Sequence, residues 1–269
     1  MEIVASRIVF SLLLLMLLLA ATGALGQFRA TVRNRHVMSA MAISATLIAI
    51  NWLAYVWAVS TNHIVAASLG YFLNPLVNVL LGVVLLKEKM RMPQVVAVGI
   101  AVSGVAVMAV SAIATLWVSL ILALSFAFYG YIRKTADIGP RQGLAAETLI
   151  LMPLALGYLV WLAGRGELSL GQDATVTTLL VMTGLITSLP LLLFATAARR
   201  MPLSTLGLLQ YLAPTIQFLI GVFIFSETLS WGQIVSFALI WTGLAIYIFD
   251  SLRSAHMARA ITPKPKAPV

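Results

Sequence analysis

The sequence contains no cysteine and few charged residues. The absence of cysteine excludes a disulfide framework, a Cys-ligated zinc site and thiol chemistry. Charged residues make up 9% of the 269 positions, whereas a soluble globular domain carries roughly 25%. Hydrophobic residues make up 61%, and the mean hydropathy is +1.04. A water-soluble chain of this length could not bury so much apolar surface, so the composition indicates a polytopic membrane protein.

Motifs for catalysis and nucleotide hydrolysis are also absent from the sequence. The chain has no Walker loop, so ATP is not its energy source. No Ser/His/Asp or paired-carboxylate arrangement is visible, and His36, His63 and His256 lie in loops or the tail, where they form no metal-ligand cluster. We therefore expect neither an enzyme nor a cofactor or bound metal.

Long apolar segments dominate the rest of the chain. A helix needs about 20 mostly apolar residues to cross a bilayer, and nine segments meet this requirement. They are residues 4–25, 37–60, 64–86, 93–112, 115–133, 144–163, 174–197, 203–225 and 231–250. The runs do not alternate with a period of two, so the expected fold class is all-α, with nine transmembrane helices. The first segment also has features of a secretory signal peptide, which is the alternative to a span.

The basic residues predict the orientation in the membrane. Fifteen of the seventeen Lys and Arg residues lie in the C-terminal tail and in the loops after segments one, three, five and seven. The exceptions are Arg7 and Arg165. This bias places those loops and the C-terminus in the cytoplasm and the N-terminus outside. The net charge of +9 then reflects topology, so nucleic acid is not an expected partner. The tail, residues 252–269, is expected to be disordered near anionic headgroups.

The sequence also repeats itself at an offset of 139 residues. Five identities fall on residue types that a shared apolar composition does not explain. The pairs are Pro75 and Pro214, Gly82 and Gly221, Glu88 and Glu227, Gln94 and Gln233, and Gly104 and Gly243. The loop after the Pro-bearing helix is basic in the first copy and has no Lys or Arg in the second, so the two copies have opposite orientations. Inverted-topology repeats are typical of secondary transporters.

The offset divides the chain into a first repeat, residues 1–112, and a second repeat, residues 113–251. The second copy has five spans, whereas the first has four. The partner of segment 115–133 would fall before residue 1. We therefore expect a ten-helix parent architecture of five plus five, in which Met1 is either a wrongly chosen start or the start of a truncated product.

Four stretches carry a resemblance to a known family. They are "NWLAYVWAVSTNHIVAASLGYFLNPLVNVLLG" (51–82), "LSFAFYGYIRK" (124–134), "STLGLLQYLAPT" (204–215) and "IWTGLAIYIFD" (240–250). The sequence resembles the RarD branch of the EamA transporters, in the drug/metabolite transporter superfamily. The resemblance implies ten helices in a bacterial-type inner membrane, a central cavity, and export of small metabolites or drugs by alternating access. It also implies an association with chloramphenicol sensitivity.

Two Pro-bearing segments carry polar groups that could line such a cavity. On each segment, polar side chains recur at helical spacing, and the proline removes a backbone donor and frees a carbonyl one turn earlier. The first set is Tyr71, Asn74, Pro75 and Asn78, and the second is Gln210, Pro214 and Gln217. The alternative is that these amides connect neighbouring helices, an ordinary use of Asn and Gln in bilayers.

Aromatic residues near the end of the second segment form another candidate group. Asn51, Trp52 and Tyr55 combine an amide with rings that suit a planar, partly apolar substrate. The alternative is an aromatic belt at the outer interface. Ser125 and Tyr129, on the fifth segment, are weaker candidates.

Two charged residues fall within the apolar segments. Glu147 lies near the start of the sixth segment and is a candidate for coupling or gating, because acids within a membrane often serve proton transfer. The alternative is that Glu147 interacts with the positive end of the helix dipole. Arg7 occupies almost the corresponding place in the first repeat, where it is either a coupling or gating charge or an interfacial residue.

The sequence therefore favours a secondary transporter that exports a small organic solute. The expected partners are the solute and the lipid bilayer, and a homodimer is compatible with the sequence. The alternative function is a truncated, non-transporting membrane subunit or a lipid-handling scaffold.

Overall fold

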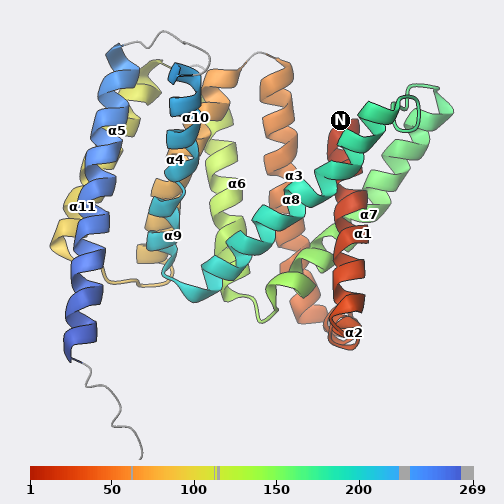
Figure 1. Ribbon diagram of the computed structural model, residues 1–269, viewed down its shortest axis with the longest axis horizontal. Coiled ribbons are helices and arrows are strands. Elements are labelled where there is room, and N and C mark those ends of the chain that lie inside the picture. Colours follow the sequence, from red (N-terminus) through yellow and green to blue (C-terminus); the bar gives the residue numbers. More distant parts are fainter. Residues whose placement is uncertain (62, 112, 114–115, 224–230, 262–269) are drawn as a thin grey trace, which may run out of the picture.

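The computed structural model describes residues 1–61, 63–111, 113, 116–223 and 231–261 and contains helices but no strands within them (Figure 1). The helices are α1 (Glu2–Ala21), α2 (Leu25–Arg33), α3 (Arg35–Ser60), α4 (Ile64–Val84), α5 (Met92–Ser111), α6 (Leu116–Thr135), α7 (Pro140–Gly164), α8 (Ala174–Arg200), α9 (Leu203–Leu209), α10 (Leu212–Phe223) and α11 (Trp231–Ile261). The prediction of an all-α, polytopic membrane protein is confirmed.

Eight of the described helices are long and apolar enough to cross a membrane. The described part of the remaining expected span, residues 203–225, is instead made of the short helices α9 and α10, with a turn between them at Gln210 and Tyr211. Interrupted helices occur in membranes only where protein or a water-filled cavity covers the exposed backbone. The difference from one continuous span therefore marks a place where the backbone is covered by something other than lipid.

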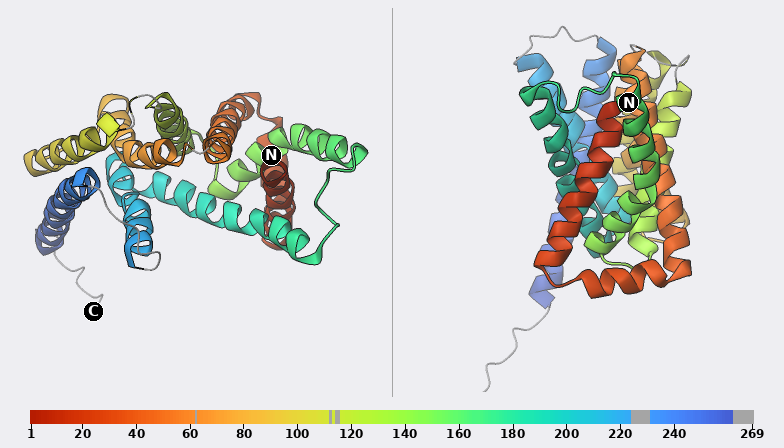
Figure 2. Two further views of the ribbon diagram at one scale, coloured as in Figure 1. Left: turned by 90° about the horizontal axis from the view of Figure 1, so that it is seen from above. Right: turned by 90° about the vertical axis from the view of Figure 1, so that its right-hand side faces the viewer.

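The spanning helices form two rows when the molecule is viewed from above (Figure 2). One row contains α5, α4, α6 and α3, and the other contains α11, α9 with α10, and α8, while α1 and α7 lie at the end where the rows meet. The closest pairings across the rows are α5 with α11 and α4 with α9, and α1 packs against both α7 and α8.

Small residues allow the helices in these pairs to approach each other closely. A Cβ atom added to Gly104 of α5 would lie 2.8 Å from the carbonyl oxygen of Ser236 on α11. A Cβ atom added to Gly243 of α11 would lie 2.5 Å from the carbonyl oxygen of Ala97 on α5. Packing of backbone against backbone is the main source of helix association in lipid, where burial of apolar surface drives little.

Two segments differ from the sequence-based expectation. Residues 26–33, expected to lie in a loop, belong to the helix α2, which lies across the ends of the spanning helices and buries Phe28 (Figure 2). The tail was expected to be disordered from residue 252, but α11 continues to Ile261. No Gly or Pro interrupts the sequence between residue 252 and Ile261, so no residue there breaks the helix.

The molecule has one strongly basic end. This basic end carries α2 and the connections 85–91, 136–139 and 201–202, and it is at the bottom of Figure 1. The opposite end carries Met1 and the connections 61–63 and 165–173.

Candidate functional site

Three amide side chains meet where α4 passes the interruption between α9 and α10. The Nδ2 atoms of Asn74 and Asn78 both donate to Oε1 of Gln210, at 2.6 Å and 2.9 Å. Both asparagines are buried, and Asn78 is fully so. We call Asn74, Asn78 and Gln210 the amide cluster.

The amide cluster keeps unused hydrogen-bonding capacity. Among the residues that the structure describes, Oδ1 of Asn74, Oδ1 of Asn78 and Nε2 of Gln210 are buried without a partner. An unpartnered buried polar atom costs roughly 1–3 kcal/mol. Two acceptors and one donor therefore stand ready for a ligand or water that supplies the complementary groups.

The local sequence explains why the amides converge. Pro214 lies buried just after the turn, and its missing N–H and its ring prevent α9 and α10 from forming one regular helix. The hydroxyl of Tyr211 donates to the carbonyl of Phe72 at 3.2 Å, which holds the turn against α4. The carbonyl of Gln210, expected to be free, accepts the amide of Ala213 at 3.2 Å.

The other residues of the two Pro-bearing faces lie near the cluster or outside the described part. Pro75 is buried within an unbroken α4, and its carbonyl oxygen would be 2.7 Å from a Cβ atom at Gly207 of α9. Glycine at position 207 is thus required for the close crossing of α4 and α9. The side chain of Gln217 lies outside the described residues.

A second group lies toward the opposite end, where α1, α3 and α4 face one another. The guanidinium carbon of Arg7 is 5.2 Å from the centre of the Trp52 ring, and the phenol groups of Tyr55 and Tyr71 are close enough to interact with its charge. The two tyrosine rings meet edge to face, with centres 5.9 Å apart. Tyr71 is 44% exposed and Tyr55 is 38% exposed, so the group is open on one side.

Asn51 has a helix-connecting arrangement. Its Nδ2 donates to the carbonyl of Leu122 at 2.9 Å and to Oγ of Ser125 at 3.1 Å, so α3 is joined to α6. Asn51 and Ser125 lie together in the structure, and both side chains take part in the contact between α3 and α6.

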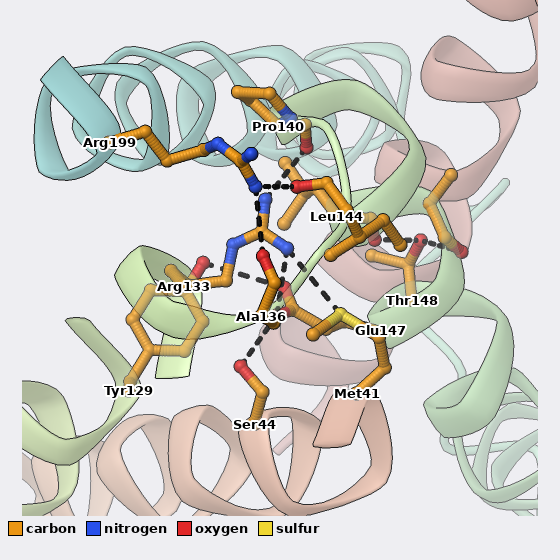
Figure 3. A network of polar contacts seen from close by, with 12 residues as sticks. Met41, Ser44, Tyr129, Arg133, Ala136, Pro140, Leu144, Glu147, Thr148 and Arg199 are labelled. Atoms are coloured by element: carbon orange, nitrogen blue, oxygen red, sulfur yellow. Dashed lines mark hydrogen bonds and ion pairs between the residues drawn. The ribbon is translucent and has the colours of Figure 1, made fainter. Parts of the chain in front are cut away.

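A buried network of charges joins α3, α6 and α7 near the basic end (Figure 3). Arg133 and Glu147 are each 1% exposed, with Nη1 of the arginine 3.6 Å from Oε1 of the acid. Glu147 also accepts hydrogen bonds from Oγ of Ser44 at 2.6 Å and from the hydroxyl of Tyr129 at 3.4 Å. Glu147 lies two turns into α7, beyond reach of the helix-end dipole. The dipole interpretation of this residue therefore does not fit the structure.

Sequence reasoning did not single out Arg133, because an arginine at the end of an apolar segment usually reaches the interface. The arginine instead turns inward. Its Nη2 donates to the carbonyl of Pro140 at 2.9 Å, and its guanidinium occupies the space that a side chain at position 143 would need. Gly143, facing the guanidinium, was the one signal in the sequence for this arrangement.

Hydrogen bonds between distant segments close the basic end. Oε1 and Oε2 of Glu88 accept the backbone amides of Leu203 and Ser204 at 2.6 Å and 3.0 Å, which caps α9. Nζ of Lys134 donates to the carbonyls of Ala198 and Met201 at the end of α8.

A cation from α8 completes this closure. Nη1 of Arg199 donates in return to the carbonyl of Ala136, at 2.9 Å, and to that of Ile138, just after α6. Cations at these carbonyl-rich helix ends are favourable. No group of His, Cys, Asp or Glu suited to a metal occurs in the ranges that the structure describes.

The all-helical fold and the polar groups enclosed between its spanning helices define a polytopic membrane protein. Comparisons with known proteins identify its family. The model of the EamA-like transporter family matches residues 1–110. The chain is 44% identical to "Protein RarD" of Streptomyces exfoliatus, over 96% of this chain and 82% of that protein. It is 30% identical to "Chloramphenicol-sensitive protein RarD" of Pseudomonas aeruginosa, over 94% of this chain and 86% of that protein.

A solved crystal structure of a protein that is 18% identical in sequence also matches. Its TM-score is 0.70, and the match covers 94% of this chain and 88% of the other, which shows a common fold. The resemblance seen in the sequence is thus confirmed. The chain belongs to the EamA-like transporter family, in its RarD branch, and is a multi-pass transporter of the bacterial inner membrane.

Proposed function

We propose that the chain is a secondary transporter that exports a small organic metabolite or drug by alternating access. The observation that carries the proposal is the amide cluster. The Pro-bearing helix α4 crosses the interrupted segment of α9 and α10 there, and three buried polar atoms have no partner among the described residues. Discontinuous helices near the bilayer midplane are the usual site of substrate binding in secondary transporters.

Contacts at the 139-residue offset support two inverted repeats, residues 1–112 and 113–251. Gly104 faces Ser236, and Gly243 faces Ala97. Gly243 lies 139 positions after Gly104, and Ser236 lies 139 positions after Ala97. Tyr211 and Phe72, which bond to each other, are also 139 positions apart. Residues related by a two-fold axis meet in this way, and exchange of conformation between two such repeats is the basis of alternating access.

In the proposed cycle, the arrangement described above is one of the two end states. Glu88, Lys134 and Arg199 close the basic end, whereas Tyr55 and Tyr71 are exposed toward the opposite end. The positive-inside rule predicts that the basic end is cytoplasmic, and with that orientation the proposed cycle makes this an outward-facing state. Opening toward the cytoplasm would break these bonds and form equivalent contacts at the other end.

The test is solute flux into proteoliposomes, with chloramphenicol as the first solute because one relative's name refers to sensitivity to it. We expect saturable flux from the wild type and at least tenfold less from Asn78→Leu, because the variant leaves the Gln210 amide with fewer partners and fills the space beside it. Thr46→Ala is the matched control, since that hydroxyl bonds within its own helix on an exposed face.

Membrane insertion and the melting temperature of Asn78→Leu should remain close to the wild type. Normal flux from this variant would remove the amide cluster from the transport path. Flux that does not respond to an imposed pH gradient would exclude proton coupling. Failure of the wild type to move any solute in a broad panel would contradict the transport proposal.

A further inference from the structure

Arg7 is a cation within a spanning helix, and it has no acidic partner among the residues that the structure describes. It lies in the second turn of α1, and its Nε is buried without a hydrogen bond among the described residues. A guanidinium in the bilayer is costly unless a counter-charge or a set of acceptors neutralises it. The counter-charge or the acceptors for Arg7 must therefore come from another part of the chain or from a bound molecule.

The described acids are occupied elsewhere. Glu2, the nearest in sequence, accepts the amides of Ser169 and Leu170 at 3.0 Å and 2.9 Å. The other acids with described contacts cap helices or pair with other arginines. These are Glu88 on α9, Glu147 with Arg133, Glu167 with Arg165, Asp173 on α8, and Asp250 with Arg91. Asp137 lies in the connection at the basic end, whereas Arg7 lies toward the opposite end.

The surroundings of Arg7 select the chemistry of a ligand. A guanidinium presents paired donors that match a carboxylate, and the Trp52 ring supports its face at 5.2 Å. The hydroxyls of Tyr55 and Tyr71 can donate to the same oxyanion, and their partly exposed rings offer an edge for a planar body.

We propose that Arg7, Trp52, Tyr55 and Tyr71 form a subsite for the carboxylate of an aromatic organic acid. This subsite rests on the proposed function, because it would bind part of the transported solute. Tyr71 shares a helix face with Asn74 and Asn78, so the subsite adjoins the amide cluster. Asn78 follows Tyr71 by seven positions, which is about 10 Å along α4. A solute of that length would place its acid group on Arg7 and an uncharged polar group at the amide cluster.

The test compares an acid with its neutral isostere on the whole protein in nanodiscs of phosphatidylcholine. The probes are indole-3-acetate and indole-3-acetamide, measured by equilibrium binding of the radiolabelled compounds. We expect the acid to bind saturably and at least tenfold more tightly than the amide, because a hydrogen bond to a charged partner is lost in the amide. Arg7→Gln should abolish this preference.

Two further variants make the test specific. Arg165→Gln is the matched control, because Arg165 also stacks on a tryptophan, at 4.6 Å from the Trp161 ring, but is exposed and paired with Glu167. It should leave binding unchanged. Tyr71→Phe removes one hydroxyl and should weaken the acid several-fold without affecting the amide. The affinities of Tyr71→Phe for the acid and the amide therefore still test the subsite if Arg7→Gln fails to fold.

Three results would overturn the subsite. These are equal affinity for acid and amide, acid binding that is unchanged in Arg7→Gln, and no saturable binding of the acid. A lipid phosphate could supply the same oxyanion. If phosphatidylglycerol, in a second set of nanodiscs that contain it, binds through Arg7 and the acid does not, the soluble-acid proposal is wrong. Acid binding through Arg7 without any flux would leave the subsite standing and remove the transport proposal instead.

Discussion

Arg133 and Glu147 show what a buried ion pair does between spanning helices. Their attraction offsets the cost of removing both charges from water only while both are present. Ser44, Tyr129 and the carbonyl of Pro140 satisfy much of the remaining hydrogen-bonding capacity. The network therefore fixes the relative positions of α3, α6 and α7 near the basic end (Figure 3).

Removing one charge of this pair should be more harmful than removing both. We expect Glu147→Leu to lower the free energy of unfolding in detergent by about 3–5 kcal/mol, because Arg133 is left buried and unpaired. The double variant Arg133→Met with Glu147→Leu should recover much of that loss. Glu167→Leu is the control, since its pair with Arg165 is exposed and such pairs contribute about 0–1 kcal/mol. A loss no larger than that of the control would refute the role assigned to the buried pair.

At the scale of helices, glycines decide how closely α5 and α11 can pack. Gly104 and Gly243 each face a backbone carbonyl of the other helix, whereas Gly99, on the same α5, has nothing within 4 Å of an added Cβ. The three positions therefore provide an internal comparison of a contact glycine with a lipid-facing one.

Gly243→Ala should force α5 and α11 apart, because its Cβ would lie 2.5 Å from the Ala97 carbonyl oxygen. We expect a loss of about 1–3 kcal/mol in unfolding free energy from this overpacking. Gly99→Ala should cause no loss, since alanine favours the helix more than glycine. If the two variants melt at the same temperature, the close contact between α5 and α11 is not what stabilises the pair.

The cap on α9 is a second feature of helix scale. Glu88→Ala removes acceptors for the amides of Leu203 and Ser204 and should destabilise the protein by about 0.5–2 kcal/mol. If closure of the basic end is part of the transport cycle, the same variant should change the flux rate more than its melting temperature alone explains. Glu167→Leu again serves as a control at an exposed acid.

The sequence predicted the helices better than their breaks and contacts. Continuous apolar runs and charged connections located the spans, and the spacing of Asn74 and Asn78 placed them on one face. The break at Gln210 was not predicted, because hydropathy does not register a turn whose backbone is covered by α4. The inward position of Arg133 depends on Gly143, ten residues further along the chain, and the pairing of Asn51 with α6 depends on a helix distant in sequence.

At the scale of the whole molecule, the two rows of helices make their closest contacts at two places. One is the glycine contact of α5 and α11, and the other is the amide cluster of α4, α9 and α10 (Figure 2). In the first, glycines pack against the backbone of the facing helix, whereas the second brings together three amide side chains that keep unpartnered atoms. In the proposed transport function, the first contact stabilises the fold and the second binds the solute.

The absence of cysteine allows a direct measurement of alternating access. Glu88→Cys with Ser204→Cys places two thiols at the closed basic end of a chain that has no others. A short bifunctional methanethiosulfonate should link them and hold that end closed. Flux of the solute identified in proteoliposomes should fall to background after linking, return on reduction, and persist in either single-cysteine variant. Undiminished flux from the fully linked protein would contradict the account.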